Sequence, residues 1–495
     1  MPPYPRTVTT ASRATAVQIV WSKKRGRLEL EHVGSAHDEV ELAALKQEAW
    51  RRIHAGQDEL GLVPPAGEGG PFRVLRSGSD RLLGALEVAW RALGFDEAVR
   101  DKAFRQLVVA RVVEPSSKLD AIRVLADLGV APPSYSTVKT CLARTVGRGY
   151  RAGLEAACAA HARVGEARFC LYDVTTLYFE THEGDGFREP GFSKERRLEP
   201  QITVGLLTTG DGFPLKVREF EGDKAETKTI LPVLDAFRKA NPACELTVVA
   251  DAGMMSWDNL GALEDAHYTF VVGGRIPAEP WCVKEWRAAH PGADLPDGQV
   301  FHQARTGTKT KPRRWHVWFQ YRAKRARRDL AGIGKTVAKA QAAINGGPVN
   351  KNRFLTIEGG QRTLNQTLVD DAKARAGLRC YVTNLDGDPQ PIIDAYHRLW
   401  HVEKAFRMSK HDLEARPVHH WRRPSIEAHL TIVFAALAIG TWIENVTGVS
   451  LRRFLETLRP IRTHTIDING HTITAEDPIN QTAADILWAI HTWGH

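Results

Sequence analysis

Several features that define common protein classes are missing from this sequence or scarce in it. The six cysteines form no CxxC pair and have no regular spacing, which argues against a disulfide framework. Several of them lie inside apolar segments, so we expect reduced core residues in a cytosolic protein. The N-terminus, MPPYPRTVTT, lacks the apolar core of a signal peptide. The apolar run at 430–443 is too short to span a bilayer. The sequence therefore predicts no membrane role.

Charge of one sign is only slightly in excess. The 67 lysines and arginines outnumber the 58 aspartates and glutamates, which gives a net charge of +9 at pH 7. For 495 residues this excess favours a polyanionic partner only weakly. At a typical size of roughly 150 residues per domain, the length predicts about three domains.

Two kinds of metal or nucleotide motif can be set aside. The GIGKT stretch at 332–336 lacks the earlier glycine of a phosphate-binding loop, because position 329 is aspartate, and it follows a basic helix rather than a strand. The histidines at 397, 401, 411, 419 and 420 belong to no HExxH or CxxC motif, so helix-surface and packing roles are favoured over zinc binding.

The first part of the chain is expected to be mixed and then helical. A hairpin over 15–34 and a charged helix over 37–55 are followed by a Pro- and Gly-rich linker at 61–71. Short helices separated by Pro and Gly follow, and they fit two readings equally. One is a helix-turn-helix whose second helix carries Lys139 and Arg144 toward DNA. The other is an ordinary helical bundle.

From residue 166 onward strands alternate with helices, in the order strand, strand, strand, helix, strand, helix, strand. The first three strands are expected to form an antiparallel meander, and the later ones to be added by right-handed crossovers. We therefore predict an α/β fold with a mixed sheet. An inserted β-rich domain and closing helices should come next, and a small hairpin and helix should end the chain. The expected segments are 1–70, 71–164, 165–275, 276–390, 391–450 and 451–495.

Two aspartates stand out in this region. Asp173 lies in the middle of the strand-like stretch LYDVTTLYFE, where a buried carboxylate costs several kcal/mol unless a cation meets it. Asp251 ends the apolar run LTVVAD, so we expect it at the carboxyl end of a strand, where open sheets place their sites. A divalent cation with oxygen ligands would relieve the repulsion between two such carboxylates.

A third carboxylate is predicted on the helix YHRLWHVEKAFRMSK. At 100° per residue, Tyr396, Arg407 and Lys410 fall within 40° of Glu403, while an apolar stripe occupies the adjacent face. A solvated face with a Glu403–Arg407 pair is the alternative. The apolar stripe and the two strand carboxylates favour a site.

In this order, Asp173, Asp251 and Glu403 resemble the DDE catalytic triad of bacterial insertion-sequence transposases. The helix is similar to the Y-x2-R-x3-E-x6-K signature of a large cut-and-paste group, in which Tyr396 and Lys410 are in register but Leu399 replaces the arginine. Four further blocks resemble a DDE subfamily: GFSKE (191–195), GLLTTGDGFPLKVREFEGD (205–223), VADAGMMSWDNL (249–260) and EKAFRMSKHDLEARPVHH (403–420). The resemblance covers roughly residues 70–450.

The resemblance implies a ribonuclease-H-like core, interrupted by the inserted domain, and two Mg²⁺ ions, for which Mn²⁺ is a substitute. Asp173 and Asp251 would hold one ion, and Asp173 and Glu403 the other. By two-metal chemistry such a site cuts DNA at transposon ends and joins the freed end to a target. The implied partners are the inverted-repeat ends, target DNA and a second copy of the chain. A catalytically silent DNA-binding descendant and a structure-selective nuclease remain as alternatives.

Further residues are candidates for contact with DNA. Tyr396, Arg407 and Lys410 would approach the DNA end from the closing helix. Lys194 and Arg188 lie in the loop after the first core strand and would approach phosphate, with a flexible charged loop as the equal alternative. Aromatic residues among basic ones in the inserted segment suit base stacking, although core packing explains any one of them as well. These aromatic candidates are Trp281, Trp286 and Trp315.

Overall fold

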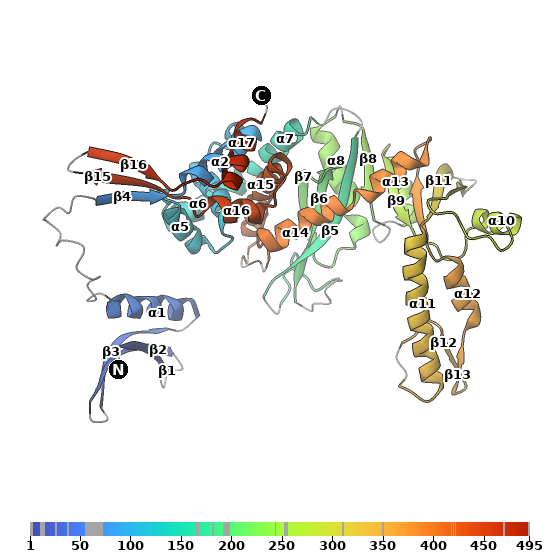
Figure 1. Ribbon diagram of the computed structural model, residues 1–495, viewed down its shortest axis with the longest axis horizontal. Helices are drawn as coiled ribbons and strands as arrows, with labels where there is room; N and C mark the ends of the chain where they lie inside the picture. Colours follow the sequence, from blue (N-terminus) through green and yellow to red (C-terminus); the bar gives the residue numbers. More distant parts are fainter. Residues whose placement is uncertain are drawn as a thin grey trace. The chain divides into compact units, whose positions relative to one another are not determined.

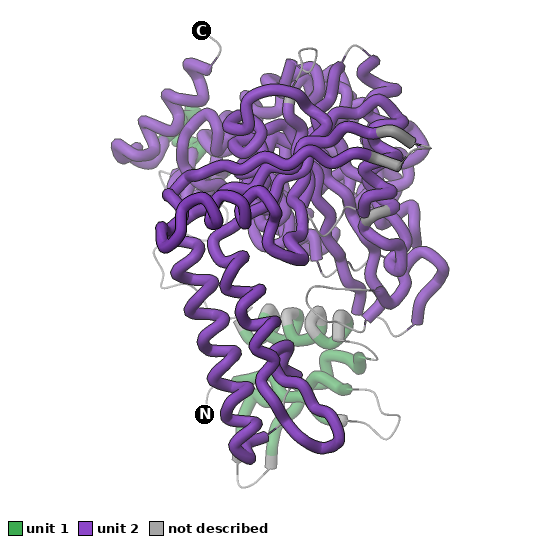
Figure 2. The backbone as a smooth tube through the Cα atoms, turned by 90° about the vertical axis from the view of Figure 1, so that its right-hand side faces the viewer, with its two compact units in different colours: residues 1–76, 464–475 green, residues 77–463, 476–495 purple. Residues whose placement is uncertain are grey.

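The chain divides into two compact units, which Figure 2 distinguishes by colour: residues 1–76 with 464–475, and residues 77–463 with 476–495. The structure is a computed structural model. The predicted linker at 61–71 lies outside the residues that it describes. The described residues are 3–9, 15–24, 27–36, 39–54, 73–163, 168–180, 183–191, 199–242, 244–251, 256–308, 311–348, 351–416, 418, 420, 422–468 and 471–493.

The first unit confirms the predicted hairpin and helix and adds a strand. The antiparallel sheet β1-β2-β3 carries α1 on its apolar face, with Val17, Ile19, Ala49 and Ile53 as its core. The C-terminal hairpin was also predicted, but its pairing with β4 was not. The elements are β1 (Tyr4–Thr9), β2 (Thr15–Lys24), β3 (Arg27–Ala36), α1 (Glu39–His54), β4 (Arg73–Gly78), β15 (Thr463–Ile468) and β16 (His471–Glu476).

In the second unit, a helical bundle surrounds one long apolar helix, α15 (Arg423–Thr447). By length and composition α15 could cross a membrane, but 94% of its most apolar stretch is buried inside the protein, so it is a core helix. Its partners are α2 (Asp80–Ala92), α3 (Phe95–Ala98), α4 (Lys102–Val113), α5 (Lys118–Asp127), α6 (Tyr135–Gly147), α7 (Tyr150–His161), α16 (Leu451–Leu458) and α17 (Gln481–His491).

An eight-stranded mixed sheet has the order β10-β11-β14-β9-β8-β5-β6-β7 (Figure 1). As predicted, β5, β6 and β7 form an antiparallel meander, and β8 and β9 are added parallel to β5. The elements are β5 (Arg168–Tyr178), β6 (Gln201–Thr209), β7 (Pro214–Glu221), a 3₁₀ turn (Glu226–Lys228), α8 (Ile230–Ala240), β8 (Leu246–Ala250), α9 (Trp257–Asp265) and β9 (Thr269–Gly274).

The region 276–390 differs from the predicted β-rich domain, because β10, β11 and β14 extend the core sheet beyond β9. A strand left at the edge of a sheet presents unpaired N–H and C=O groups, and β14 satisfies those of β9. The elements are α10 (Trp281–Ala289), β10 (Val300–Thr308), β11 (Lys311–Tyr321), α11 (Ala323–Ile344), β12 (Leu355–Glu358), β13 (Gln361–Leu364), α12 (Gln366–Ala374) and β14 (Leu378–Thr383).

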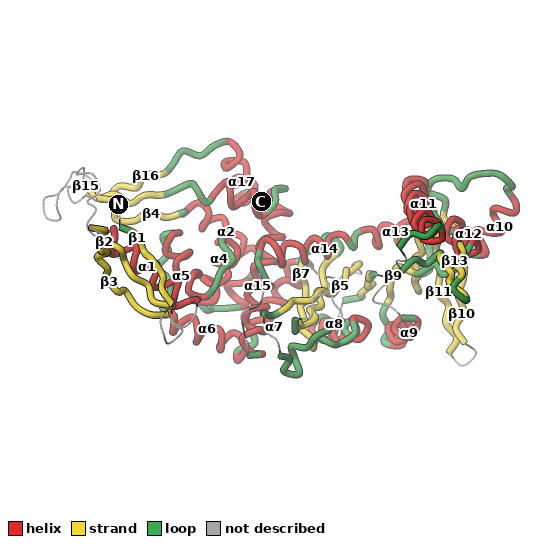
Figure 3. Tube along the Cα trace, turned by 90° about the horizontal axis from the view of Figure 1, so that it is seen from below, coloured by secondary structure: helices red, strands yellow, loops and turns green. Residues whose placement is uncertain are grey.

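Helices cover both faces of the sheet. Figure 3 shows α8 and α9 on one side of the strands and α13 (Pro389–His397) and α14 (Trp400–Arg407) on the other. The side chains follow the period of two of a strand. In β5, Tyr172 and Val174 pack in the α8–α9 core, whereas Leu171 and Leu177 belong to the core that includes α13, α14 and α15. The α13–α15 face therefore receives the odd-numbered side chains of β5.

Candidate functional site

Asp173 and Asp251 lie at matching positions of neighbouring parallel strands. The β5–β8 register pairs Leu171 with Val249, and two further residues along each strand bring Asp173 level with Asp251. Alternation then fixes their face. Because Leu171 and Val249 point to the α13–α15 side, both aspartates do so as well. This confirms that Asp251 directly follows its strand, and it puts both carboxylates on one face.

Glu403 reaches the same face from α14. Val402 and Phe406 are buried in the core that includes the sheet, whereas Glu403 is exposed. Lys404 ties α14 to α15 through an ion pair with Glu444 at 2.5 Å. Asp173 and Glu403 line one cavity of about 280 Å³.

We call this the carboxylate cavity. Its other charged and ionisable lining residues are Glu226, Arg407, Lys410, His411 and Arg416.

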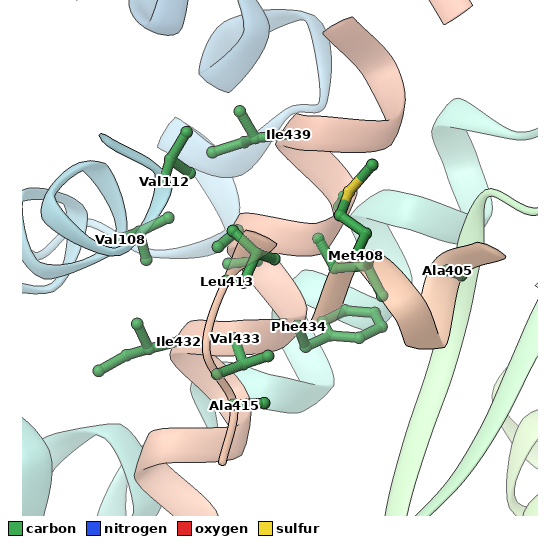
Figure 4. Packing of buried hydrophobic residues seen from close by; sticks show 14 of the residues in the cluster. Val108, Val112, Ala405, Met408, Leu413, Ala415, Ile432, Val433, Phe434 and Ile439 are labelled. Atoms are coloured by element: carbon green, nitrogen blue, oxygen red, sulfur yellow. The ribbon is translucent and has the colours of Figure 1, made fainter. Parts of the chain in front are cut away.

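After Arg407 the helix continues as a π-helical turn over Met408–Asp412, which contains Lys410. Such turns occur often at functional sites. Figure 4 shows Met408 and Leu413 packed among Val433, Phe434 and Ile439 of α15. Gly440 permits this approach, because a Cβ at that position would lie 2.9 Å from the Met408 sulfur. This packing holds Lys410, in the π turn, at the same cavity as Glu403 and Arg407 of α14.

Tyr396 does not share the face of Glu403, because the helix is interrupted at residues 398–399. Its phenol donates a hydrogen bond of 2.9 Å to Asp251 Oδ1. Gly273 makes room for the phenol, since a Cβ there would lie 2.4 Å from its oxygen. Burial and the neighbouring Asp251 raise the pKa of Tyr396, so it remains a protonated donor at neutral pH.

Asp251 and Tyr396 line a second and larger cavity, of about 690 Å³, which we call the arginine cavity. Its arginines are Arg325, Arg328, Arg353, Arg375 and Arg379. The structure thus brings Asp173 and Glu403 together in one cavity and puts Asp251 on the border of another. Within the described ranges, no group of three or more His, Cys, Asp or Glu residues is arranged so that it could hold a metal ion.

Two other phosphate or base contacts predicted from the sequence have structural roles here. Arg188 is buried, forms an ion pair with Asp185 at 2.9 Å and covers the ring of Phe179, so it does not suit a phosphate contact. Trp315 is only 5% exposed and donates its N–H to Glu264 at 3.1 Å, so it does not suit base stacking. Lys194 lies outside the described residues.

Of the other two aromatic candidates, Trp281 is exposed, whereas Trp286 packs against Phe301 and His290. Trp257, which the sequence reading missed, is also exposed. It stacks on Trp315 with ring centroids 5.6 Å apart, and Arg305 covers it at 3.4 Å from the ring centroid. The reading also missed Glu226 in the carboxylate cavity and the arginines of the second cavity. Arg325 and Arg328 stand three residues apart on a helix, and this spacing is a signal that could have been used.

The contacts of Arg144 favour an ordinary helical bundle over a helix-turn-helix for residues 71–164. Its guanidinium donates to Asp101 at 2.9 Å, and Asp101 also accepts from Tyr150 and caps α4. Burial by itself would raise the pKa of Asp101. The hydrogen bonds from Arg144 and from the backbone outweigh this effect, so the pKa of Asp101 is lowered. Lys139 is exposed and covers the ring of Tyr135 at 4.6 Å from its centroid.

Replacing Arg144 with glutamine is therefore expected to lower the free energy of unfolding by about 1–3 kcal/mol, because an almost buried carboxylate loses a charged partner. The exposed Lys139→Gln change should stay within about 0.5 kcal/mol. Chemical denaturation of both variants measures this difference. Unchanged stability of Arg144→Gln together with weakened DNA binding would instead favour the helix-turn-helix reading.

The GIGKT stretch lies inside α11, and all six cysteines are free, five of them buried and Cys282 partly so. Both observations agree with the sequence reading. A nucleotide-binding loop joins a strand to a helix, and a stretch in the interior of a 22-residue helix has no such geometry.

Comparison with known proteins gives the family. The family model of the transposase DDE domain matches residues 165–439, more than half of the chain. No match was found among curated proteins. A solved structure of piggyBac transposase, a synaptic complex with hairpin DNA, is 11% identical, with a TM-score of 0.38, and the match covers 76% of this chain and 70% of that one. A likeness at this level carries no argument of its own. On the family match, which spans the sheet, both aspartates, the glutamate helix and most of α15, the chain belongs to the DDE transposases.

Proposed function

We propose that this protein cuts DNA at the ends of a mobile element and joins the freed ends to target DNA, with Asp173, Asp251 and Glu403 as its catalytic carboxylates. One observation carries the proposal. The carboxylate cavity combines Asp173 from β5 and Glu403 from α14 with three cationic side chains, Arg407, Lys410 and Arg416. Carboxylates suit a divalent cation, and the cations suit a phosphodiester.

The proposed core is ribonuclease-H-like. The strand order β7-β6-β5-β8-β9, with three antiparallel strands followed by two parallel ones, supports this assignment. In open sheets, ligands bind at the carboxyl ends of parallel strands. Asp251 follows the carboxyl end of β8, and Asp173 is level with it on β5.

The residues fit magnesium, although they do not form a closed ligand set. Mg²⁺ prefers oxygen ligands and is commonly held by one or two carboxylates together with substrate phosphates. Asp173 and Glu403, which share a cavity, would hold one ion, and Asp173 and Asp251, which share a register, would hold the other. When bound, the ions activate the attacking oxygen and stabilise the leaving oxygen.

The protein's own groups position the DNA. Lys410 and Arg407 would bind non-bridging oxygens of the phosphates next to the cleaved bond, because they lie in the cavity of Asp173 and Glu403. Tyr396 would orient Asp251 by donating to its Oδ1. The substrate is double-stranded DNA with inverted-repeat ends, and a dimer would pair the two ends before joining.

The test uses purified protein and a labelled duplex carrying the inverted repeats that flank its gene. With Mg²⁺ or Mn²⁺ we expect cuts at the repeat boundary, none with EDTA, and none in a duplex with scrambled repeats. Addition of a target plasmid should give joined products. Binding without cuts would favour the silent descendant, and cuts at branched DNA without joining would favour a structure-selective nuclease.

Replacing Lys410 with alanine is expected to weaken binding of the element end and to lower the slope of log K against log salt by about one, because about one phosphate contact is lost. Fluorescence anisotropy at several salt concentrations measures this slope. Lys239→Ala is the matched control, because Lys239 is exposed on α8, which covers the opposite face of the sheet. Equal losses in the two variants would contradict a specific role for Lys410.

A further inference from the structure

The arginine cavity has a composition that the proposed chemistry does not use. Its lining contains five arginines and two acidic residues, Asp251 and Asp329. Its volume of about 690 Å³ falls within the usual range for ligand sites, about 300–1,000 Å³. A guanidinium presents a planar fork of N–H donors that matches phosphate oxygens. The ligand chemistry that fits this lining is therefore a phosphate diester or monoester.

The arginines converge from separate parts of the chain, which distinguishes the cavity from the solvated face of a single helix. Arg325 and Arg328 come from α11, Arg353 precedes β12, and Arg379 comes from β14. Arg375 has a structural role, because it donates to the carbonyls of Ile276 and Pro277. Of the other four, Arg325 pairs with Asp329, and Arg353 and Arg379 lie over the rings of Phe354 and Tyr396. A guanidinium that covers a ring still presents N–H donors at its edge, so these groups are able to bind a ligand as well.

Arg325 gives an independent sign of an unmet polar group. Its Nε is buried and has no hydrogen-bond partner among the residues that the structure describes. Asp329 Oδ2, with which Arg325 forms an ion pair, is 3.6 Å from this Nε, beyond hydrogen-bond distance. A buried donor without a partner costs free energy, and an anionic ligand in the cavity would recover it.

The face of α11 that lines the cavity leaves open space at its centre. Arg325, Arg328, Asp329, Gly332, Ile333 and Thr336 follow the i, i+3, i+4, i+7 spacing of one helix face. Glycine inside a helix costs about 1 kcal/mol relative to alanine. A Cβ at Gly332 would meet nothing within 4 Å, so close packing does not explain this glycine. Its missing side chain keeps the cavity open.

We propose that the arginine cavity binds the sugar-phosphate backbone of the DNA strand that runs from the carboxylates toward α11 and α12. This rests on the proposed function, which makes DNA the substrate. Asp251 connects the two places, because it lines the cavity and stands level with Asp173 on the sheet. The cavity is then a phosphate site beside the scissile bond, separate from Lys410 and Arg407.

The test measures binding of the labelled inverted-repeat duplex by anisotropy without divalent metal, over a range of KCl concentrations. We expect Arg328→Gln to weaken binding about tenfold and to lower the salt slope by about one. Gly332→Leu, which fills the cavity, should also weaken binding about tenfold. Arg327→Gln and Gly334→Leu are matched controls on the same helix that do not line the cavity, and each should change affinity less than about twofold.

The assignment would be overturned if the cavity variants and their controls weakened DNA binding equally, or if none of the four variants weakened it. Loss of dAMP binding in Arg328→Gln, with DNA binding unaltered, would overturn it in favour of a nucleotide site. Because the assay contains no metal, it is independent of cleavage. A wild-type protein that binds ends through Arg328 but never cuts them would overturn strand cleavage and support the cavity assignment.

Discussion

Replacing Asp173 with asparagine should reduce DNA cleavage by at least about 10³-fold, because the change removes one charged group that both proposed ions share. Asparagine keeps the size and shape of the side chain, so β5 and its register with β6 and β8 should remain. DNA binding should stay the same or become tighter, since a negative charge near the phosphates is lost. Gel analysis of cleavage and anisotropy of binding measure the two quantities separately.

The matched control for Asp173 is Glu226→Gln. Glu226 follows β7, lines the same cavity and carries the same charge, but it is outside the proposed triad. We expect this variant to retain cleavage within about tenfold of wild type. The interaction of one carboxylate charge with the ions through water is worth about 1 kcal/mol. Equal losses in the two variants would mean that the cavity needs negative charge in general. Cleavage that survived Asp173→Asn would refute the triad.

The sequence was sufficient to predict five of the eight strands of the core sheet, β5 to β9, and the position of two carboxylates on them. Apolar residues with a period of two, bounded by turns, mark β5 to β9, and parallel strands joined by helices have few possible arrangements. Asp173 was recognisable because it interrupts an otherwise strand-forming stretch. Asp251 was recognisable because it ends one. Each is a local signal, and local signals are readable from one sequence.

The errors come from contacts between residues far apart in the chain. A regular helix of 100° per residue put Tyr396 beside Glu403, but α13 ends at His397 and the next helix ends in a π turn. No proline or glycine marks these changes. Packing of Met408 on Gly440 accompanies the π turn, and this contact cannot be read from the helix itself.

Burial of the basic and aromatic candidates has the same explanation. Trp315 is buried because it meets Phe270 and Glu264, residues that come about 50 positions earlier. Arg144 is held by Asp101, 43 residues away. A sequence shows that a side chain is able to bind DNA, but only the tertiary structure shows that another residue already binds it.

Asp251 lines the arginine cavity and not the carboxylate cavity, so its proposed role as a metal ligand needs a test of its own. Asp251→Asn should reduce cleavage by at least about 10³-fold, as Asp173→Asn does, if Asp251 is a ligand of an ion. Tyr396→Phe removes only the phenol that donates to Asp251 Oδ1. Loss of a group that orients a metal ligand typically costs 10–100-fold in metal affinity or activity, so a smaller effect is expected there.

The two variants differ in what excess metal can restore. In Tyr396→Phe the carboxylate remains but is less well oriented, so cleavage should need a higher Mn²⁺ concentration for half of its maximal rate and should recover at saturation. In Asp251→Asn the charge itself is lost, and saturating Mn²⁺ should not restore it. A Tyr396→Phe protein with the wild-type Mn²⁺ dependence would show that the phenol does not position Asp251. A Tyr396→Phe protein that needed less Mn²⁺ than wild type would show that the hydrogen bond holds Asp251 away from the ion. The phenol and the metal would then compete for the Asp251 carboxylate.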